Sequence, residues 1–437
     1  MGQGENQVKG HIGRSQTSDS APQFTRGMHS LHCSPPTWIC SQIGTREYYA
    51  IPNALYQQGK LAGLATDWYA PRSPILRHLL GRLSRSALLA RSSTIPDELV
   101  RSFPLRSLLW KRKVRRLAAQ GRAYEAYAQT DSAFASAVSN LIFPPHQIFF
   151  GYSYASLEIL EAERRRGVKT LLGQIDPGAL EFRLVSDEMS RFPEFAGPPS
   201  EFPTNFYDRN RREWELADRI LVNSEFSREA LIKQGVQPEK LVVVPLCFEP
   251  QKDSAVAKSK KTATGQPLNV LFLGQVILRK GIHYLLEAAR KLDPEKVHFD
   301  VVGPVGIKPE AVAKAPQNVT FHGRAVGRQA ADWYRRSDLF VLPTLSDGFA
   351  ITQLEAMSHG LPVVATPCCG EVVADGIDGF VVPPRDPAAL VGAFQKYLAE
   401  PELLGHQGIS ALKKASLFTT ERLTKNLKDV EKLMVRV

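Results

Sequence analysis

The stretch that decides the fold is LPTLSDGFAITQLEAMSHGLPVVAT, from Leu342 to Thr366. The strand-like run LFVLP leads into it, and the apolar run LPVVAT closes it. Between these runs lie two carboxylates eight positions apart, Asp347 and Glu355, on either side of a turn that opens a helix. Because a buried carboxylate needs a partner, acids in such an apolar setting favour a ligand-binding turn.

The turn itself has the composition of an anion-binding site. Gly348 carries no side chain, so a ligand can approach the backbone closely there. We expect the helix to begin near Ala350, with the free N–H groups of Ala350, Ile351 and Thr352 pointing at a phosphate.

The two acids then have distinct expected partners. Asp347, just outside the helix start, would accept hydrogen bonds from sugar hydroxyls, and Glu355 would take a ribose diol. The plain structural alternative makes Asp347 an acid near the helix cap and Glu355 a solvated helix residue.

A second anion site is indicated by LFLGQVILRKG, from Leu271 to Gly281. A strand ends at Gly274 and a helix begins near Gly281, with Arg279 and Lys280 between them. Two cations beside a helix start suit a doubly charged anion such as a diphosphate. Taken alone, the same letters also fit a solvated basic loop.

Short apolar runs alternate with helical patterns along most of the chain, which predicts parallel sheets with crossover helices. The chain of 437 residues exceeds what one core usually fills, and EPQKDSAVAKSKKTATGQP reads as a linker. We therefore predict an α/β protein with two doubly wound domains and a ligand cleft between them. The expected parts are a disordered segment 1–35, a first domain 36–250, a linker 251–267, a second domain 268–415, and a C-terminal helix 416–437 that returns to the first domain.

Together the two site motifs resemble those of the retaining glycosyltransferases of family 4, which are group 1 glycosyltransferases with the GT-B fold of two facing Rossmann-like domains. The resemblance is strongest from Asn269 to Pro387, where SDGFAITQLEAMSHGLPVVAT matches the family's acid-x7-acid motif. It implies transfer of a sugar from a nucleotide diphosphate sugar, with retention of configuration and with no metal or other cofactor.

The resemblance also assigns roles to residues. The implied catalytic residues are Arg279, Lys280 and Asp347. The implied donor-binding residues are Gly274, Gln275, Gly348, Phe349, Ala350, Ile351, Thr352 and Glu355. The implied acceptor-side residues are Gly44, Gln174 and Asp176.

This chain departs from the family's pattern at three places. Gln275 stands where the family usually has arginine, so Arg279 is expected to supply the second cation. The first acid of the pair is Asp347 rather than glutamate. Gln174 and Asp176 occupy the neighbourhood where many members carry a histidine, which leaves the acceptor-side chemistry open.

The net charge of +11 is concentrated between Arg72 and Arg122, where thirteen Lys and Arg residues face only Asp97 and Glu98. One interpretation is contact with an anionic membrane face that presents a hydroxyl-bearing glycan or a lipid-linked acceptor. The alternative is a solvated basic helix whose leucines face its own core. No nucleic-acid-binding motif accompanies the charge, so a polyanion-binding protein is a minor alternative. We expect a cytoplasmic protein, and the membrane interpretation of the charge would place it peripherally at the inner membrane face.

Two other enzyme classes are alternatives. GYSYA, from Gly151 to Ala155, approximates the nucleophile elbow of a serine hydrolase, although Ser153 fits a helix N-cap better. A GT-B epimerase would act on the same donors without an acceptor.

Overall fold

Two parallel β-sheets, each covered by helices on both faces, form the framework of the protein. The computed structural model describes residues 37–70, 91–198, 200–249 and 266–435. The described residues of both sheets belong to one compact unit. The predicted α/β class with two Rossmann-like sheets is thereby confirmed.

The first sheet contains seven strands in the order β3-β2-β1-β4-β5-β6-β7, and every pair of neighbours is parallel. The order reverses between β1 and β4, which makes this edge the topological switch point. The strands are β1 (Trp38–Gln42), β2 (Leu61–Thr66), β3 (Val100–Ser102), β4 (Ile148–Tyr152), β5 (Lys169–Gln174), β6 (Arg219–Val222) and β7 (Leu241–Val243).

The second sheet contains six strands in the order β10-β9-β8-β11-β12-β13, again all parallel. Its switch point lies between β8 and β11, the two strands that the site motifs follow. The strands are β8 (Leu268–Leu273), β9 (Val297–Val302), β10 (Val319–Gly323), β11 (Leu339–Leu342), β12 (Val363–Ala365) and β13 (Gly379–Val381).

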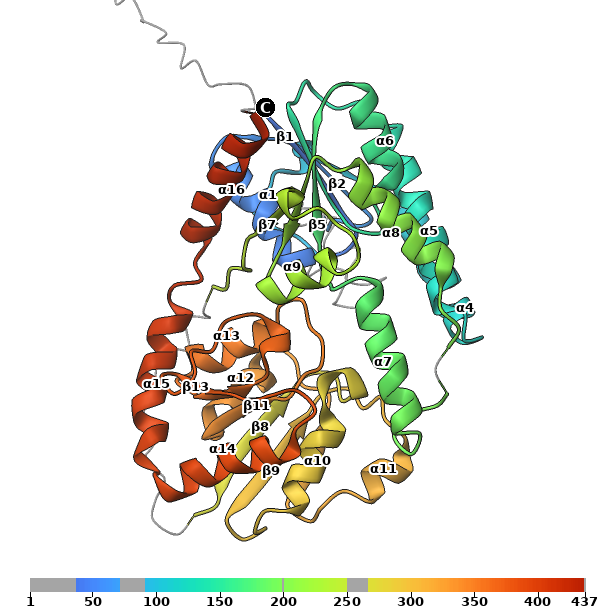
Figure 1. Cartoon of the computed structure of the whole chain (residues 1–437). Coiled ribbons are helices and arrows are strands. Elements are labelled where there is room, and N and C mark those ends of the chain that lie inside the picture. Colours follow the sequence, from blue (N-terminus) through green and yellow to red (C-terminus); the bar gives the residue numbers. More distant parts are fainter. Residues whose placement is uncertain (1–36, 71–90, 199, 250–265, 436–437) are drawn as a thin grey trace, which may run out of the picture. The chain divides into compact units, whose positions relative to one another are not determined.

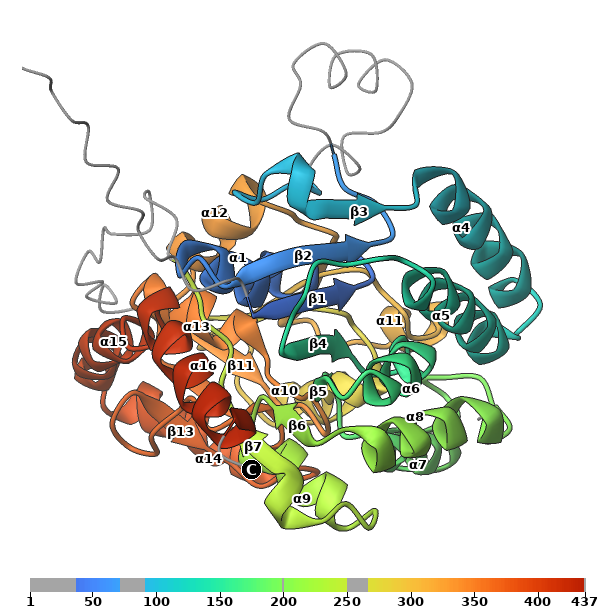
Figure 2. The same cartoon turned by 90° about the horizontal axis from the view of Figure 1, so that it is seen from above.

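Helices connect the strands and cover both faces of each sheet (Figures 1 and 2). Those before residue 250 are α1 (Ala50–Gln57), α4 (Pro104–Ala118), α5 (Ala123–Ser139), α6 (Leu157–Arg165), α7 (Ala179–Arg191), α8 (Thr204–Leu216) and α9 (Glu225–Ile232). The later ones are α10 (Ile282–Arg290), α11 (Pro309–Ala313), α12 (Arg328–Arg336), α13 (Ile351–Ser358), α14 (Pro387–Ala399), α15 (Glu402–Ala415) and α16 (Thr420–Val435). Short 3-10 turns are η1 (Arg46–Tyr49), η2 (Asp97–Leu99), η3 (Pro238–Lys240), η4 (Leu278–Lys280) and η5 (Pro367–Cys369).

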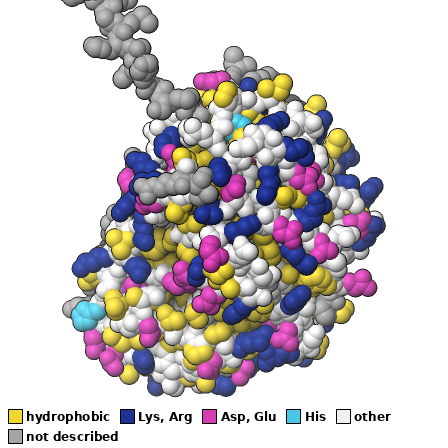
Figure 3. All heavy atoms as spheres, turned by 45° about the horizontal axis from the view of Figure 1, so that its top comes forward, with side chains coloured by type: hydrophobic (Ala, Val, Ile, Leu, Met, Phe, Trp, Pro, Cys, Tyr) yellow, Lys and Arg dark blue, Asp and Glu magenta, His cyan; other side chains and the backbone are white. Residues whose placement is uncertain are grey.

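The strands explain why each sheet has a core on both faces. Successive side chains of a strand point to opposite faces, so apolar runs bury both sides. Trp38 and Cys40 of β1 pack into one cluster with α1 and α16, while Ile39 packs into another with α5 and α6. On the outer surface, basic, acidic and hydrophobic side chains are interspersed over the face in Figure 3.

Helix α16 and the segment after α7 each join the core of the sheet that is distant from them in sequence. Helix α16 packs against the first sheet, where Glu431 accepts a hydrogen bond from Trp38 Nε1 at 3.1 Å and pairs with Lys60. Residues that follow α7, including Phe195, pack into the core of the second sheet. Each sheet therefore carries a segment from the other half of the chain.

Several predicted segments lie outside the described residues. They are the whole of the segment 1–35, most of the linker 251–267, and the leucine-spaced part of the basic region, within residues 71–90. Within the described ranges, no helix combines the length and the apolar character needed to span a bilayer.

Substitutions in α16 test whether this helix packs into the core of the first sheet. Leu427→Ala removes a side chain that is 1% exposed in the core shared with β1, so we expect a loss of about 2–5 kcal/mol in unfolding free energy. Leu433→Ala on the same helix removes a side chain that is 47% exposed and should change stability by about 0.5 kcal/mol or less. Urea denaturation of the two variants measures the difference, and equal effects would contradict the docking of α16.

Candidate functional site

The candidate site lies at the switch point of the second sheet. Turn η4 follows β8, and the loop of residues 343–350 follows β11, its neighbour in the sheet. Because the carboxyl ends of neighbouring parallel strands meet at one edge, the two sequence motifs come together there.

Turn η4 is fixed by hydrogen bonds from the loop after β11. The carbonyl oxygen of Arg279 accepts from Leu345 N at 2.9 Å and from Thr344 Oγ1 at 3.1 Å. Gly281 follows with φ of 72°, and a Cβ atom there would lie 1.8 Å from the Pro343 carbonyl oxygen. Only glycine allows this turn to lie so close to the loop.

The two cations of the turn face Asp347. Lys280 Nζ donates to Asp347 Oδ2, and the Arg279 guanidinium lies 3.9 Å from Asp347 Oδ1. Arg279 also donates to the Ser346 carbonyl at 2.8 Å. All three charged side chains are largely buried, so their charges are only weakly screened by water. The three residues singled out as catalytic candidates therefore form one cluster.

The reason for glycine at position 348 differs from the expected one. A Cβ atom at Gly348 would lie 2.4 Å from the carbonyl oxygen of Ile175, which follows β5 of the first sheet. In addition, Ser224 Oγ of the first sheet's half donates to the Gly348 carbonyl at 2.7 Å. The backbone that approaches Gly348 closely is therefore the protein's own. Through these contacts the loop after β11 is joined to the half of the chain that carries the first sheet.

The start of α13 also requires a correction. The N–H of Ala350, expected to be free, donates to the Cys369 carbonyl at 3.0 Å. Ile351 and Thr352 are the first two residues of α13, and their N–H groups have no acceptor within the helix. Phe349 is buried in the core below, in contact with Phe418.

The remaining donor-side candidates surround this centre. Gly274 follows β8, and its N–H donates to the Val302 carbonyl at 2.9 Å; Gln275 beside it is exposed. Glu355 is half-buried rather than buried, and its partner is the hydroxyl of Tyr334, which donates at 2.7 Å.

The acceptor-side candidates lie at the carboxyl ends of β1 and β5. Gly44 N donates to Asp67 Oδ1 at 2.7 Å. Gln174 is buried, and its Oε1 accepts from Trp214 Nε1 at 2.8 Å. Its amide donates to Asp176 Oδ1 at 3.1 Å, so Gln174 orients Asp176 rather than facing a ligand itself.

One further residue of this site was not found from the sequence. Glu181 of α7 accepts from Ser346 Oγ at 2.7 Å and lies 3.5 Å from the Arg279 guanidinium. Burial raises the pKa of Glu181 to about 7, although the Arg279 charge opposes this rise. No sequence pattern marks Glu181, because α7 is distant in sequence from the motifs that it meets.

The structure also corrects the interpretation of GYSYA. The N-cap position of α6 is taken by Ser156, whose Oγ donates to the Tyr152 carbonyl at 2.7 Å, and not by Ser153. Ser153 faces a cavity of about 360 Å³ in which no histidine is among the lining residues that the structure describes. A serine nucleophile would lack its base there, which disfavours the hydrolase alternative.

A family model described as "Glycosyl transferases group 1" matches residues 267–400, the part of the chain that carries both site motifs. The resemblance to group 1 glycosyltransferases is confirmed. A D-inositol 3-phosphate glycosyltransferase from Streptomyces bingchenggensis is 30% identical over 238 residues, which cover 49% of this chain and 52% of that protein. A protein of the same name from Geodermatophilus obscurus is 30% identical over 48% of this chain and 51% of its own length. The chain thus spans about half the length of the curated relatives it matches.

Solved GT-B structures resemble the fold over most of the chain. A sucrose-phosphate synthase from Thermosynechococcus elongatus matches with a TM-score of 0.57 at 17% identity, covering 91% of this chain and 98% of that one. Anabaena HepE in complex with UDP and glucose also matches with a TM-score of 0.57, at 15% identity, covering 91% and 99%. The predicted GT-B fold is therefore confirmed.

The contact at Gly348 yields a prediction for stability. Gly348→Ala places a methyl group against the Ile175 carbonyl, so we expect a loss of about 1–3 kcal/mol in unfolding free energy. Gly392→Ala in α14 meets no atom within 4 Å and should instead stabilise by about 0.5–1 kcal/mol. Thermal or urea unfolding of both variants checks this. A Gly348→Ala protein as stable as the parent would show that the loop does not lock the two halves.

Proposed function

We propose that this protein is a glycosyltransferase that moves a sugar from a nucleotide diphosphate sugar to a hydroxyl acceptor. The observation that carries the proposal is the cluster of Arg279 and Lys280 at the switch point of the second sheet, beside the start of α13. The match of residues 267–400 to group 1 glycosyltransferases supports it.

The chemical role of this cluster follows from the charge that develops during transfer. When the glycosidic bond breaks, negative charge grows on the diphosphate leaving group. Arg279 and Lys280 would stabilise that charge, together with the N–H groups of Ile351 and Thr352. In the free protein the two cations are held by Asp347 and Glu181, so a diphosphate would replace these carboxylates as their partner.

The acids of the motif would hold the sugar and the nucleoside. Asp347 would accept from sugar hydroxyls, and Glu355 would accept from the ribose diol. We propose retention of the anomeric configuration, with the acceptor hydroxyl attacking on the leaving-group face and the departing phosphate taking its proton. This route needs no protein nucleophile.

The same two cations would stabilise the charge on the leaving diphosphate, as a divalent metal ion does in other transferases. We therefore propose transfer without a metal cofactor. The acceptor would be a glycan or lipid-linked hydroxyl compound.

A peripheral membrane contact would bring such an acceptor to a cytoplasmic enzyme. Helix α4 belongs to the described part of the basic region, and its Leu105 and Leu109 side chains are 79% and 65% exposed. Arg112, Arg115 and Arg116 are exposed on the same helix. Exposed leucines beside arginines suit the interface of an anionic bilayer.

A thermal-shift panel of nucleoside diphosphates and nucleotide diphosphate sugars first identifies the donor, since a bound ligand raises stability with its affinity. Lys280→Ala should then reduce the transfer rate by about 10²- to 10³-fold, because one charge-stabilising donor is lost. Release of the nucleoside diphosphate from that donor measures the rate.

The matched control is Lys291→Ala, which removes an exposed lysine paired with Glu287 on α10 and should leave the rate unchanged. Lys280→Arg should keep part of the activity, and an EDTA wash should have no effect. Near-normal turnover by Lys280→Ala would remove this residue from the proposed role. Conversion of the donor sugar without any acceptor would instead identify an epimerase.

The membrane proposal is tested by co-sedimentation of the full chain with vesicles of phosphatidylcholine and phosphatidylglycerol. The double variant Arg112→Glu/Arg116→Glu should lower binding on the order of tenfold, since each basic residue contributes about 1 kcal/mol at an anionic surface. Lys425→Glu/Lys428→Glu makes the same charge change on exposed positions of α16 and should bind normally. Binding that ignores anionic lipid content and salt would contradict the proposal.

A further inference from the structure

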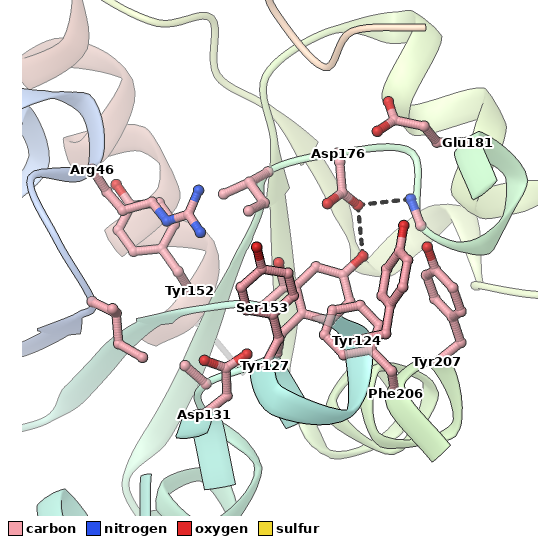
Figure 4. A pocket seen from close by; sticks show the side chains of 15 residues that line it. Arg46, Tyr124, Tyr127, Asp131, Tyr152, Ser153, Asp176, Glu181, Phe206 and Tyr207 are labelled. Atoms are coloured by element: carbon pink, nitrogen blue, oxygen red, sulfur yellow. Dashed lines mark hydrogen bonds between the residues drawn. The ribbon is translucent and has the colours of Figure 1, made fainter. Parts of the chain in front are cut away.

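A second cavity lies at the switch point of the first sheet and has no role in donor binding as proposed above. It occupies about 360 Å³ between the carboxyl ends of β1, β4 and β5 and the helices α5 and α8 (Figure 4). In doubly wound sheets this edge is where ligands bind. The size is that of a small-ligand site.

Aromatic side chains form one wall of this cavity. Tyr154 and Phe206 stack with ring centroids 4.3 Å apart and an interplanar angle of 13°. Tyr124 meets Phe206 edge-on at 5.3 Å, and Tyr127 and Tyr207 complete the wall. Packed rings of this kind present a rigid apolar surface, which suits the C–H face of a pyranose ring.

Carboxyl groups lie at both ends of this aromatic wall: Figure 4 shows Asp131 beside Tyr127, and Asp176 and Glu181 at the other end of the cavity. Asp176 Oδ1 accepts from the hydroxyl of Tyr154 at 2.7 Å and from Gly178 N at 2.8 Å, so its carboxylate is held in one orientation. Arg46 is the single Lys or Arg among the described lining residues. Glu181 is already paired with Arg279, which leaves Asp131 and Asp176 against Arg46. This lining favours sugar hydroxyls, which donate to carboxylates, over phosphate groups.

An unsatisfied hydroxyl points to a ligand in the same place. Ser153 is 2% exposed and lines the cavity, and its Oγ has no hydrogen-bond partner among the described residues. Leaving a buried hydroxyl unpaired lowers stability, so such groups in native proteins have a specific reason. The next residue, Tyr154, is held at φ of 73°, a strained backbone conformation that aims this turn at the cavity.

The cavity is linked to the cationic cluster through Glu181, which lines the cavity and contacts Ser346 and Arg279. A molecule in the cavity therefore lies next to the site proposed for the leaving group.

We propose that this cavity binds an uncharged sugar ring of the acceptor and discriminates against phosphorylated sugars. The inference rests on the proposed transferase function. Ser153 would donate to or accept from a ring hydroxyl, the tyrosine wall would pack on the ring, and Asp131 with Asp176 would exclude phosphate.

The test uses the full chain, first with UDP and the other nucleoside diphosphates in a thermal-shift assay. Saturation-transfer difference NMR then compares pairs of probes that differ only in charge. The pairs are D-glucose with D-glucose 6-phosphate, D-mannose with D-mannose 6-phosphate, and myo-inositol with its 3-phosphate. We expect at least one neutral member to bind and its phosphorylated partner to bind about tenfold more weakly or worse.

Variants tie this binding to the cavity. Tyr127→Ala removes a half-exposed wall residue and should abolish the neutral-sugar signal, whereas Tyr56→Ala on α1, outside the cavity, should not. Ser153→Ala should weaken the sugar by about fivefold while leaving the melting temperature equal or higher, since its hydroxyl is unpaired in the free protein. Asp131→Asn should reduce the difference in affinity between the neutral and the phosphorylated probes.

The outcomes separate the two proposals. If no nucleoside diphosphate binds, the transferase function itself fails. If a nucleoside diphosphate binds but no neutral sugar does, or if a phosphorylated sugar binds as tightly as its neutral partner, only the assignment of this cavity is overturned.

Discussion

The site depends on the pairing of the Arg279 and Lys280 cations with Asp347. These charges lie on two loops that are 67 positions apart in sequence, and the sheet brings them together because β8 and β11 are neighbours. The backbone then fixes their geometry, since Leu345 N and Thr344 Oγ1 both donate to the Arg279 carbonyl. Preorganised charge of this kind stabilises a developing anion without the need to reorient side chains during the reaction.

Contacts with the first sheet hold the same loop from the other side. Gly348 lies against the Ile175 carbonyl, its own carbonyl accepts from Ser224, and Glu181 reaches the arginine of the cationic turn. These contacts therefore connect the switch point of the first sheet with that of the second. An acceptor in the cavity beside Asp176 would meet a donor beside Lys280 without a large rearrangement of the strands.

Local sequence patterns were sufficient to predict the sheet class and the cationic turn. Apolar runs separated by helical patterns predict parallel sheets, and Arg279, Lys280 and Asp347 each follow a predicted strand. That these two strands, β8 and β11, are neighbours is seen in the structure. The reasons for individual backbone features were not predictable in the same way. Gly348 lies against Ile175, which follows β5. The N–H of Ala350 donates to the carbonyl of Cys369, and Glu181 comes from α7. Each of these contacts depends on how segments far apart in sequence pack. The expected N-cap role of Ser153 was also wrong, because the chain turns at Tyr154 and α6 is capped at Ser156.

The most direct measurement of the central claim is a crystal structure of the full chain with the nucleoside diphosphate that gives the largest thermal shift. We expect its terminal phosphate within hydrogen-bonding distance of Lys280 Nζ, the Arg279 guanidinium and the first amides of α13, with Asp347 released from Lys280. A nucleotide bound elsewhere, with the Lys280–Asp347 pair intact, would contradict the account.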